Sequence, residues 1–125
     1  MDNFFIEATN YSPQVSMDAQ NGTISITGKS YPENTFEFYK PIIEWIERYF
    51  HSPQSQTILN MEILYFNSSS SKLFFDMFDL LEMHKDKSDI TINWIYDKEN
   101  DTALEAGEEF MEDFEDLDFN LIEKS

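Results

Sequence analysis

The pattern of apolar and polar positions along the chain predicts strands alternating with helices. Residues 23–27 alternate apolar and polar side chains, as in a strand with one buried face, and residues 58–67 form a longer apolar run typical of a buried strand. Apolar residues recur at helical spacing in other segments. The expected strands are 4–9, 14–19, 23–27, 58–67, 90–96 and 119–122, and the expected helices are 36–50, 70–84 and 101–114.

This order, β-β-β-α-β-α-β-α-β, predicts an α/β fold of the mixed (α+β) kind. Asn21-Gly22 is typical of a two-residue hairpin turn, so we expect the opening strands to form an antiparallel meander. Helices alternating with the later strands predict a mixed sheet whose later strands are parallel, with flanking helices. No internal repeat or boundary interrupts residues 1–125, which we expect to form a single domain.

The first helix has two ambiguous features. Asn34 or Thr35 can cap its start, and Pro41 inside it predicts either a later start or a bend. We expect its buried face to carry Phe38, Ile42, Trp45, Ile46 and Tyr49. Trp45 and Trp94 both fall on core-facing positions, where packing explains them.

The net charge of −17 narrows the set of partners. A field of that sign repels phosphate backbones and anionic membrane surfaces, so we expect neither nucleic acid nor membrane as a partner. Ten acidic residues and no Lys or Arg lie between Glu99 and Asp118, which indicates either a solvated helix face or a docking surface for a basic protein. There is no cysteine, no long apolar run and no basic leader, so we expect a cytoplasmic protein.

Most catalytic chemistry has no residues to support it. A serine triad would have to use His51 or His84, and both are better explained as surface residues at helix ends. The sequence shows no zinc spacing, calcium loop or glycine-rich phosphate loop, so we expect no metal and no cofactor. One alternative to a non-enzymatic protein stays open, a small acidic ligand- or metal-binding domain or enzyme that uses surface carboxylates.

Four consecutive serines, Ser68 to Ser71, stand where the 58–67 strand gives way to the next helix. Free backbone N–H groups and the positive helix end favour a phosphate at such a junction. One serine could simply cap the helix, with the others filling a polar turn. Alternatively, one could accept a phosphate, adding about −1.5 to −2 charge at the helix entrance and repelling an apolar or acidic partner surface.

Several blocks, in order along nearly the whole chain, resemble the SiaC family of bacterial regulatory phosphoproteins. The block at the serine run is Leu64-Tyr-Phe-Asn-Ser-Ser-Ser, followed by Asp76-Met-Phe-Asp-Leu-Leu-Glu82. The others are Ser30-Tyr-Pro-Glu-Asn-Thr35, Ile43-Glu-Trp-Ile-Glu-Arg-Tyr-Phe50, Trp94-Ile-Tyr-Asp97 and Ala106-Gly-Glu-Glu-Phe-Met-Glu-Asp113.

The resemblance implies a STAS-like fold, similar to anti-sigma-factor antagonists, and a partner-switching role without catalysis. In this family a residue at the start of the second helix is phosphorylated by a dedicated serine/threonine kinase and restored by a PP2C-type phosphatase. The unphosphorylated form binds and activates an effector such as a diguanylate cyclase, which makes c-di-GMP and promotes biofilm. The family's phosphorylated threonine, in Leu-Asn-Thr-Ser-Ser, falls on Ser68 here, with Ser69 as second choice because the extra serines blur the register.

We therefore expect a monomer or weak dimer that works through protein partners. Ser68 is the expected phosphoacceptor, and partner contacts are expected from the adjoining turn and from a loop at the same end of the sheet. These candidate contact residues are Asn67, Ser69, Tyr31, Pro32, Glu33 and Asn34.

Overall fold

Residues 1–124, which the computed structural model describes, form strands and helices in the predicted order. The strands are β1 (Phe4–Ile6), β2 (Gln14–Asp18), β3 (Thr23–Ser30), β4 (Gln56–Phe66), β5 (Asp89–Asp97) and β6 (Asp118–Lys124). The helices are α1 (Thr35–Tyr49), α2 (Ser68–Met83) and α3 (Asp101–Asp113). All lie within a few residues of the expected bounds, so the reading of the fold class is confirmed.

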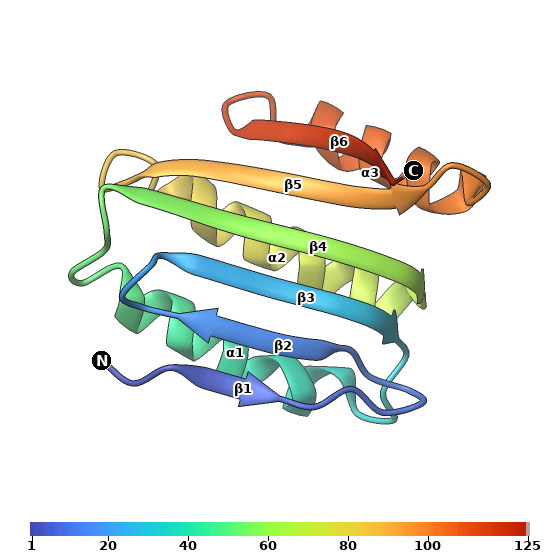
Figure 1. Cartoon of the computed structure of the whole chain (residues 1–125), viewed down its shortest axis with the longest axis horizontal. Helices are drawn as coiled ribbons and strands as arrows, with labels where there is room; N and C mark the ends of the chain where they lie inside the picture. Colours follow the sequence, from blue (N-terminus) through green and yellow to red (C-terminus); the bar gives the residue numbers. More distant parts are fainter. Residues whose placement is uncertain (125) are drawn as a thin grey trace.

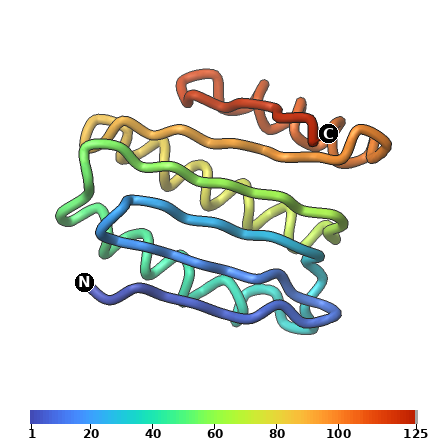
Figure 2. Tube along the Cα trace, viewed as in Figure 1, coloured from blue at the N-terminus to red at the C-terminus, as the bar shows by residue number. Residues whose placement is uncertain are grey.

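The strands lie side by side in the order of the chain, β1-β2-β3-β4-β5-β6. Figure 2 shows this directly, because the colours cross the sheet in sequence order from blue to red. The pairs β1–β2 and β2–β3 are antiparallel, whereas β3 to β6 are parallel. The expected meander and the expected parallel half are both confirmed.

All three helices pack on one face of the sheet (Figure 1). Parallel connections are right-handed, and each of these connections steps to the next strand in the same direction, so every crossover passes on the same side. The opposite face is open and polar. Ser25, Asn60, Asn93 and Asn120 stand opposite one another across it, and Asn93 donates a hydrogen bond to Asn60 at 2.9 Å.

The core fills the space between the sheet and the helix layer. Trp45 and Trp94 are both buried in it, as expected. On α1 the buried residues are Thr35, Tyr39, Ile42, Trp45, Ile46 and Tyr49, so Tyr39 occupies the position that we expected for Phe38. Phe38 is only partly buried, with its ring edge-to-face against Tyr39 at 4.9 Å.

Two local expectations differ from the structure. The hairpin between β2 and β3 pairs Asp18 with Thr23, so its loop consists of residues 19–22 and the prediction of a two-residue turn is wrong. Gly22 ends this loop with a φ of 67°, a conformation that favours glycine. Pro41 lies inside α1, which begins at Thr35 with Asn34 as its N-cap. The later start is therefore wrong, because enough of α1 packs on the core to offset one missing backbone donor.

The third helix comes close to the sheet because it carries Gly107 at the contact. A Cβ atom at Gly107 would lie 2.5 Å from Trp94 Cδ1 and 2.8 Å from Leu121 Cδ2. Trp94 is fully buried and donates a hydrogen bond from Nε1 to the carbonyl of Ala103 at 2.9 Å. Glycine at this position thus sets the distance between α3 and β5.

Candidate functional site

The serine run forms the first turn of α2, directly after β4. Asn67 is the N-cap, and its side-chain oxygen accepts the backbone N–H of Ser70 at 2.8 Å. This bond satisfies one of the N–H groups that a helix start leaves without an intrahelical partner. The predicted strand–helix junction is confirmed, and the helix begins at Ser68 rather than at residue 70.

The serines of the run have different surroundings. Ser68 and Ser69 are exposed, Ser71 is partly buried and Ser70 is completely buried. A kinase must reach the hydroxyl that it modifies, so Ser70 is unsuitable as an acceptor in the folded protein. The geometry thus leaves Ser68 and Ser69 as the accessible hydroxyls of the first helical turn.

Ser70 instead joins the helix to the sheet and to α1 through buried hydroxyls. Its Oγ donates to the carbonyl of Ser30 at 2.9 Å and lies 2.8 Å from the Oγ of Ser30, which in turn lies 2.6 Å from the hydroxyl of Tyr39. Burial raises the pKa of Tyr39 far above its ordinary value, with the Ser30 hydrogen bond as a smaller opposing effect, so the phenol stays neutral. Sequence reasoning missed this network, because its members are far apart along the chain.

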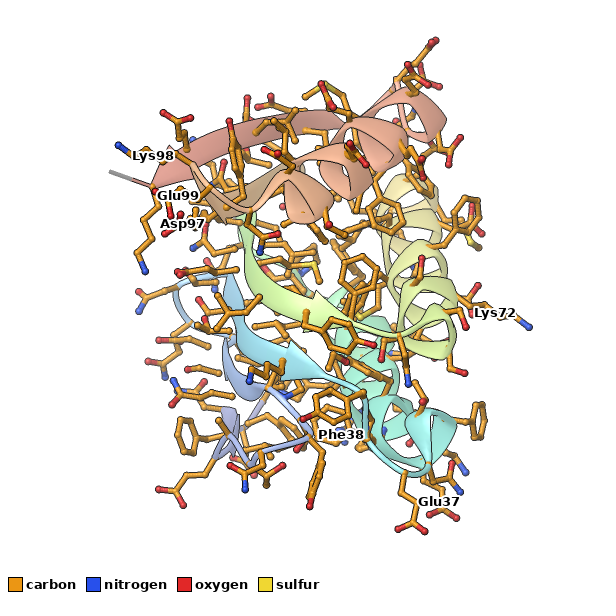
Figure 3. The ribbon with its side chains drawn as sticks, turned by 90° about the vertical axis from the view of Figure 1, so that its right-hand side faces the viewer. Glu37, Phe38, Lys72, Asp97, Lys98 and Glu99 are labelled. Carbon is orange, nitrogen blue, oxygen red and sulfur yellow. The ribbon has the colours of Figure 1, made fainter. Side chains whose placement is uncertain are left out.

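Ser68 and Ser69 face different hollows on the two sides of α2. Ser68 lines a hollow of about 790 Å³ between α2 and α3, together with Thr102 at the start of α3. Ser69 lines a hollow of about 530 Å³ between α1 and α2, together with Glu33, Asn34 and Thr35. Lys72 borders both hollows, and in Figure 3 its side chain extends from α2 into solvent.

The predicted partner loop, Tyr31 to Asn34, lies at the same end of the sheet as the serine run. The carbonyl of Ser30 accepts the backbone N–H of Asn67 at 3.1 Å, which fixes the loop beside the start of α2. Glu33 and Asn34 border the hollow of Ser69, while Pro32 is partly buried. The structure therefore brings the expected residues together, although Asn34 also caps α1 by accepting the N–H of Glu37 at 3.1 Å.

A row of tyrosines crosses this end of the molecule. Tyr31 packs edge-to-face between Tyr11, at a ring distance of 5.6 Å, and Tyr65, at 5.5 Å. Tyr11 and Tyr65 are 58% and 56% exposed, which makes the row part of the accessible surface near Ser68. Of these three tyrosines, only Tyr31 was predicted from the sequence to contact a partner. The sequence gives no signal for the others, because the apolar run of β4 continues through Leu64 and Tyr65, and only the structure shows that both are exposed.

The serine–histidine chemistry considered for the chain finds no geometric support. His84 follows the last residue of α2, and the 16 residues of that helix put it roughly 24 Å from Ser68. His51 is exposed just beyond α1. Within residues 1–124, no three His, Asp or Glu side chains gather as they would around a metal ion. Nor does any helix in that range have the length and apolar character needed to cross a bilayer.

Comparison with known proteins adds independent findings. The family model for the SiaC family regulatory phosphoprotein matches residues 6–124. SiaC of Pseudomonas aeruginosa has the same fold, with a TM-score of 0.84 at 34% identity over 98% of this chain and 97% of that one. The SiaC chain in the crystal structure of diguanylate cyclase SiaD in complex with its activator SiaC, from the same species, matches with a TM-score of 0.84 at 34% identity over 96% and 97% of the two chains.

A curated but uncharacterized protein of Pseudomonas aeruginosa (strain UCBPP-PA14) is 38% identical over 114 residues, which is 90% of either chain. Together these matches confirm the resemblance seen in the sequence blocks and the mixed α/β fold.

Proposed function

The chain belongs to the SiaC family of regulatory phosphoproteins, and from this premise we propose that it is a non-catalytic switch protein with Ser68 as its phosphoacceptor. The observation that carries the proposal is that Ser68 and Ser69 expose their hydroxyls in the first turn of α2, whereas Ser70 is buried. Of the two, Ser68 stands where the resemblance to the family puts the phosphorylated residue. A dedicated kinase adds the phosphate and a PP2C-type phosphatase removes it. We treat residues 1–125 as one cytoplasmic domain that acts through these partners.

The effector in this proposal is a diguanylate cyclase, bound and activated by the unphosphorylated form. Support comes from the solved complex in which the activator SiaC is bound to the diguanylate cyclase SiaD, since this chain shares that activator's fold. The output would then be c-di-GMP and biofilm formation.

A phosphate on Ser68 can be accommodated without unfolding the helix. The N-terminus of α2 carries partial positive charge and exposed N–H groups, which stabilise an added anion. Lys72 lies one helical turn further on, at the i+4 position, where side chains on a helix meet. The phosphate therefore changes the surface rather than the fold, and an effector that packs apolar or acidic groups against Ser68 is repelled.

Ser69 is the second choice for the acceptor and provides the internal control. It is as accessible as Ser68 but borders the hollow between α1 and α2, near Glu33 and Asn34. Ser69 and these two residues, with Asn67, Tyr31 and Pro32, are the proposed partner contacts at this end of the sheet.

Two measurements test the proposal. The protein is first incubated with its cognate kinase and ATP, and phosphate is mapped by mass spectrometry in the wild type and in Ser68→Ala, Ser69→Ala and Ser70→Ala variants. We expect phosphate on Ser68, and its loss only in Ser68→Ala. Phosphate on another residue would overturn the acceptor assignment.

The second measurement is c-di-GMP synthesis by the partner cyclase. Ser68→Ala should activate it as the unphosphorylated protein does, whereas Ser68→Asp should weaken activation by about tenfold, the size expected from one unfavourable interfacial charge. Ser52→Asp serves as the matched control, because it adds the same charge at an exposed serine in the loop between α1 and β4, away from the proposed contacts. Equal activation by Ser68→Ala and Ser68→Asp would contradict the switch.

A further inference from the structure

The hollow that Ser68 borders continues as a groove between α2 and α3. Its floor is apolar and includes Phe75, whose side chain is 42% exposed in spite of its size. Its rim is formed by carboxylates. The apolar lining residues are Phe66, Phe75, Ala106 and Phe110, and the acidic ones are Asp76, Glu105, Glu109 and Asp113.

The groove runs between the starts of α2 and α3 and the last turn of α3. The rings of Phe75, on α2, and Phe114, the C-cap of α3, lie 4.9 Å apart and bring the two helices into contact. Ser68 and Thr102, at the starts of α2 and α3, line its other end. The groove therefore follows α3 from Thr102 to Asp113, roughly 16 Å or three turns of helix.

No ion pair among the described residues involves the carboxylates of the rim. The ion pairs within residues 1–124 join Lys85 to Asp116 and Lys124 to Glu62, so none includes a rim acid. Lys72 is the single basic residue of the lining, and its side chain extends into solvent (Figure 3). An exposed aromatic floor between unpaired acids is matched by a partner that supplies apolar and cationic groups together.

We propose that this groove binds a cationic amphipathic helix of a partner protein. Apolar side chains of that helix would cover Phe75 and its neighbours, while lysines or arginines pair with Glu105, Glu109 and Asp113. A groove between two helices offers no free strand edge, which favours a helical ligand over an extended one. Both flanking helices begin at the end lined by Ser68 and Thr102, so their dipoles favour a bound helix whose C-terminus lies at that end.

Other occupants fit the charges less well. Phosphate-bearing surfaces such as nucleic acid or anionic lipid are repelled by a net charge of −17. A second copy of this chain has only 8 Lys and Arg against 25 Asp and Glu, and no helix within residues 1–124 carries a basic stripe. The inference does not depend on phosphorylation, because the groove has this charge and shape in the unmodified protein.

The test uses a fluorescein-labelled peptide of 18 residues built from Leu and Lys, with the leucines on one helical face. A scrambled peptide of the same composition has the same charge but no apolar face. Binding to the full chain is measured by fluorescence anisotropy at several salt concentrations. We expect the patterned peptide to bind about tenfold more tightly than the scrambled one, and both affinities to fall with salt.

Matched charge reversals locate the binding. Glu105→Lys with Glu109→Lys alters the groove, whereas Glu44→Lys with Glu47→Lys makes the same change in charge on the exposed face of α1. We expect the groove pair to weaken binding by at least about tenfold and the α1 pair by less than about threefold. Phe75→Ala should also weaken binding by about tenfold, with circular dichroism used to check that each variant is folded.

Two outcomes would overturn the proposal. Equal weakening by the two charge-reversed pairs would mean that the peptide responds to net charge alone. Equal binding of the patterned and scrambled peptides would mean that the apolar floor takes no part.

Discussion

Removing the hydroxyl of Ser70 tests whether this serine has a structural role while its neighbours do not. In Ser70→Ala the helix loses a hydrogen bond to the Ser30 carbonyl at 2.9 Å and a contact to the Ser30 Oγ at 2.8 Å. At about 1 kcal/mol for each bond, and with about 0.5 kcal/mol recovered from the better helix propensity of alanine, the free energy of unfolding should fall by about 1 to 2 kcal/mol.

The loss is not larger because no buried group is left without a partner. The Ser30 carbonyl keeps the N–H of Asn67 at 3.1 Å, and the Ser30 Oγ keeps the Tyr39 hydroxyl at 2.6 Å. Ser30→Ala should therefore be more damaging than Ser70→Ala, since it leaves the buried phenol of Tyr39 without its partner.

Urea unfolding followed by tryptophan fluorescence measures this effect. Ser68→Ala and Ser69→Ala are matched controls on the same turn, and both should stay within about 0.5 kcal/mol of the wild type because their side chains are exposed. A double-mutant cycle of Ser70→Ala with Tyr39→Phe should give a coupling of about 0.5 kcal/mol or more. The reasoning fails if Ser70→Ala unfolds at the same urea concentration as Ser69→Ala.

Three further changes have defined outcomes. Gly107→Ala should destabilise by about 1 to 3 kcal/mol despite its better helix propensity, because the new Cβ meets the fixed ring of Trp94; an unchanged thermal midpoint would contradict this. Asn67→Ala should cost about 1 kcal/mol through the lost cap, and Asn67→Asp should restore most of it in urea unfolding. Burial lowers the pKa of His84, whose ring stacks on Phe50. The neutral ring therefore contributes to the free energy of unfolding above about pH 6.5, the pKa of an unfolded histidine, and this contribution is lost as the pH falls below that value. The stability difference between wild type and His84→Gln should change between pH 7.5 and 5.5, and a constant difference would refute the effect.

The element order could be predicted because local patterns carry it. Alternation in β3, helical spacing in α2 and the polar turns between elements all survive in the structure. The burial of Tyr39 in place of Phe38 on the inner face of α1 could not be predicted in this way. Tyr39 can be buried because Ser30, on a strand before the helix, supplies a partner for its hydroxyl.

The candidate site, too, could be predicted from the sequence only in part. The position of the serine run at the start of a helix could be predicted from the sequence. The sequence did not predict that Ser70 is buried against the end of β3 while Ser68 and Ser69 are exposed. The groove between α2 and α3 depends on how closely Gly107 lets α3 approach the sheet, which no local pattern records.

The order of strands across the sheet, which follows the chain from β1 to β6, bears on how the protein folds. Within residues 1–124 every strand pairs only with strands adjacent to it in sequence. Even in the parallel half, partners such as Gln56 and Asp89 are therefore only 33 residues apart. The entropy lost on closing each loop is correspondingly modest, and no strand has to wait for a distant segment. The β1–β3 meander can form first, and each later helix and strand can then add to the existing edge as the chain leaves the ribosome.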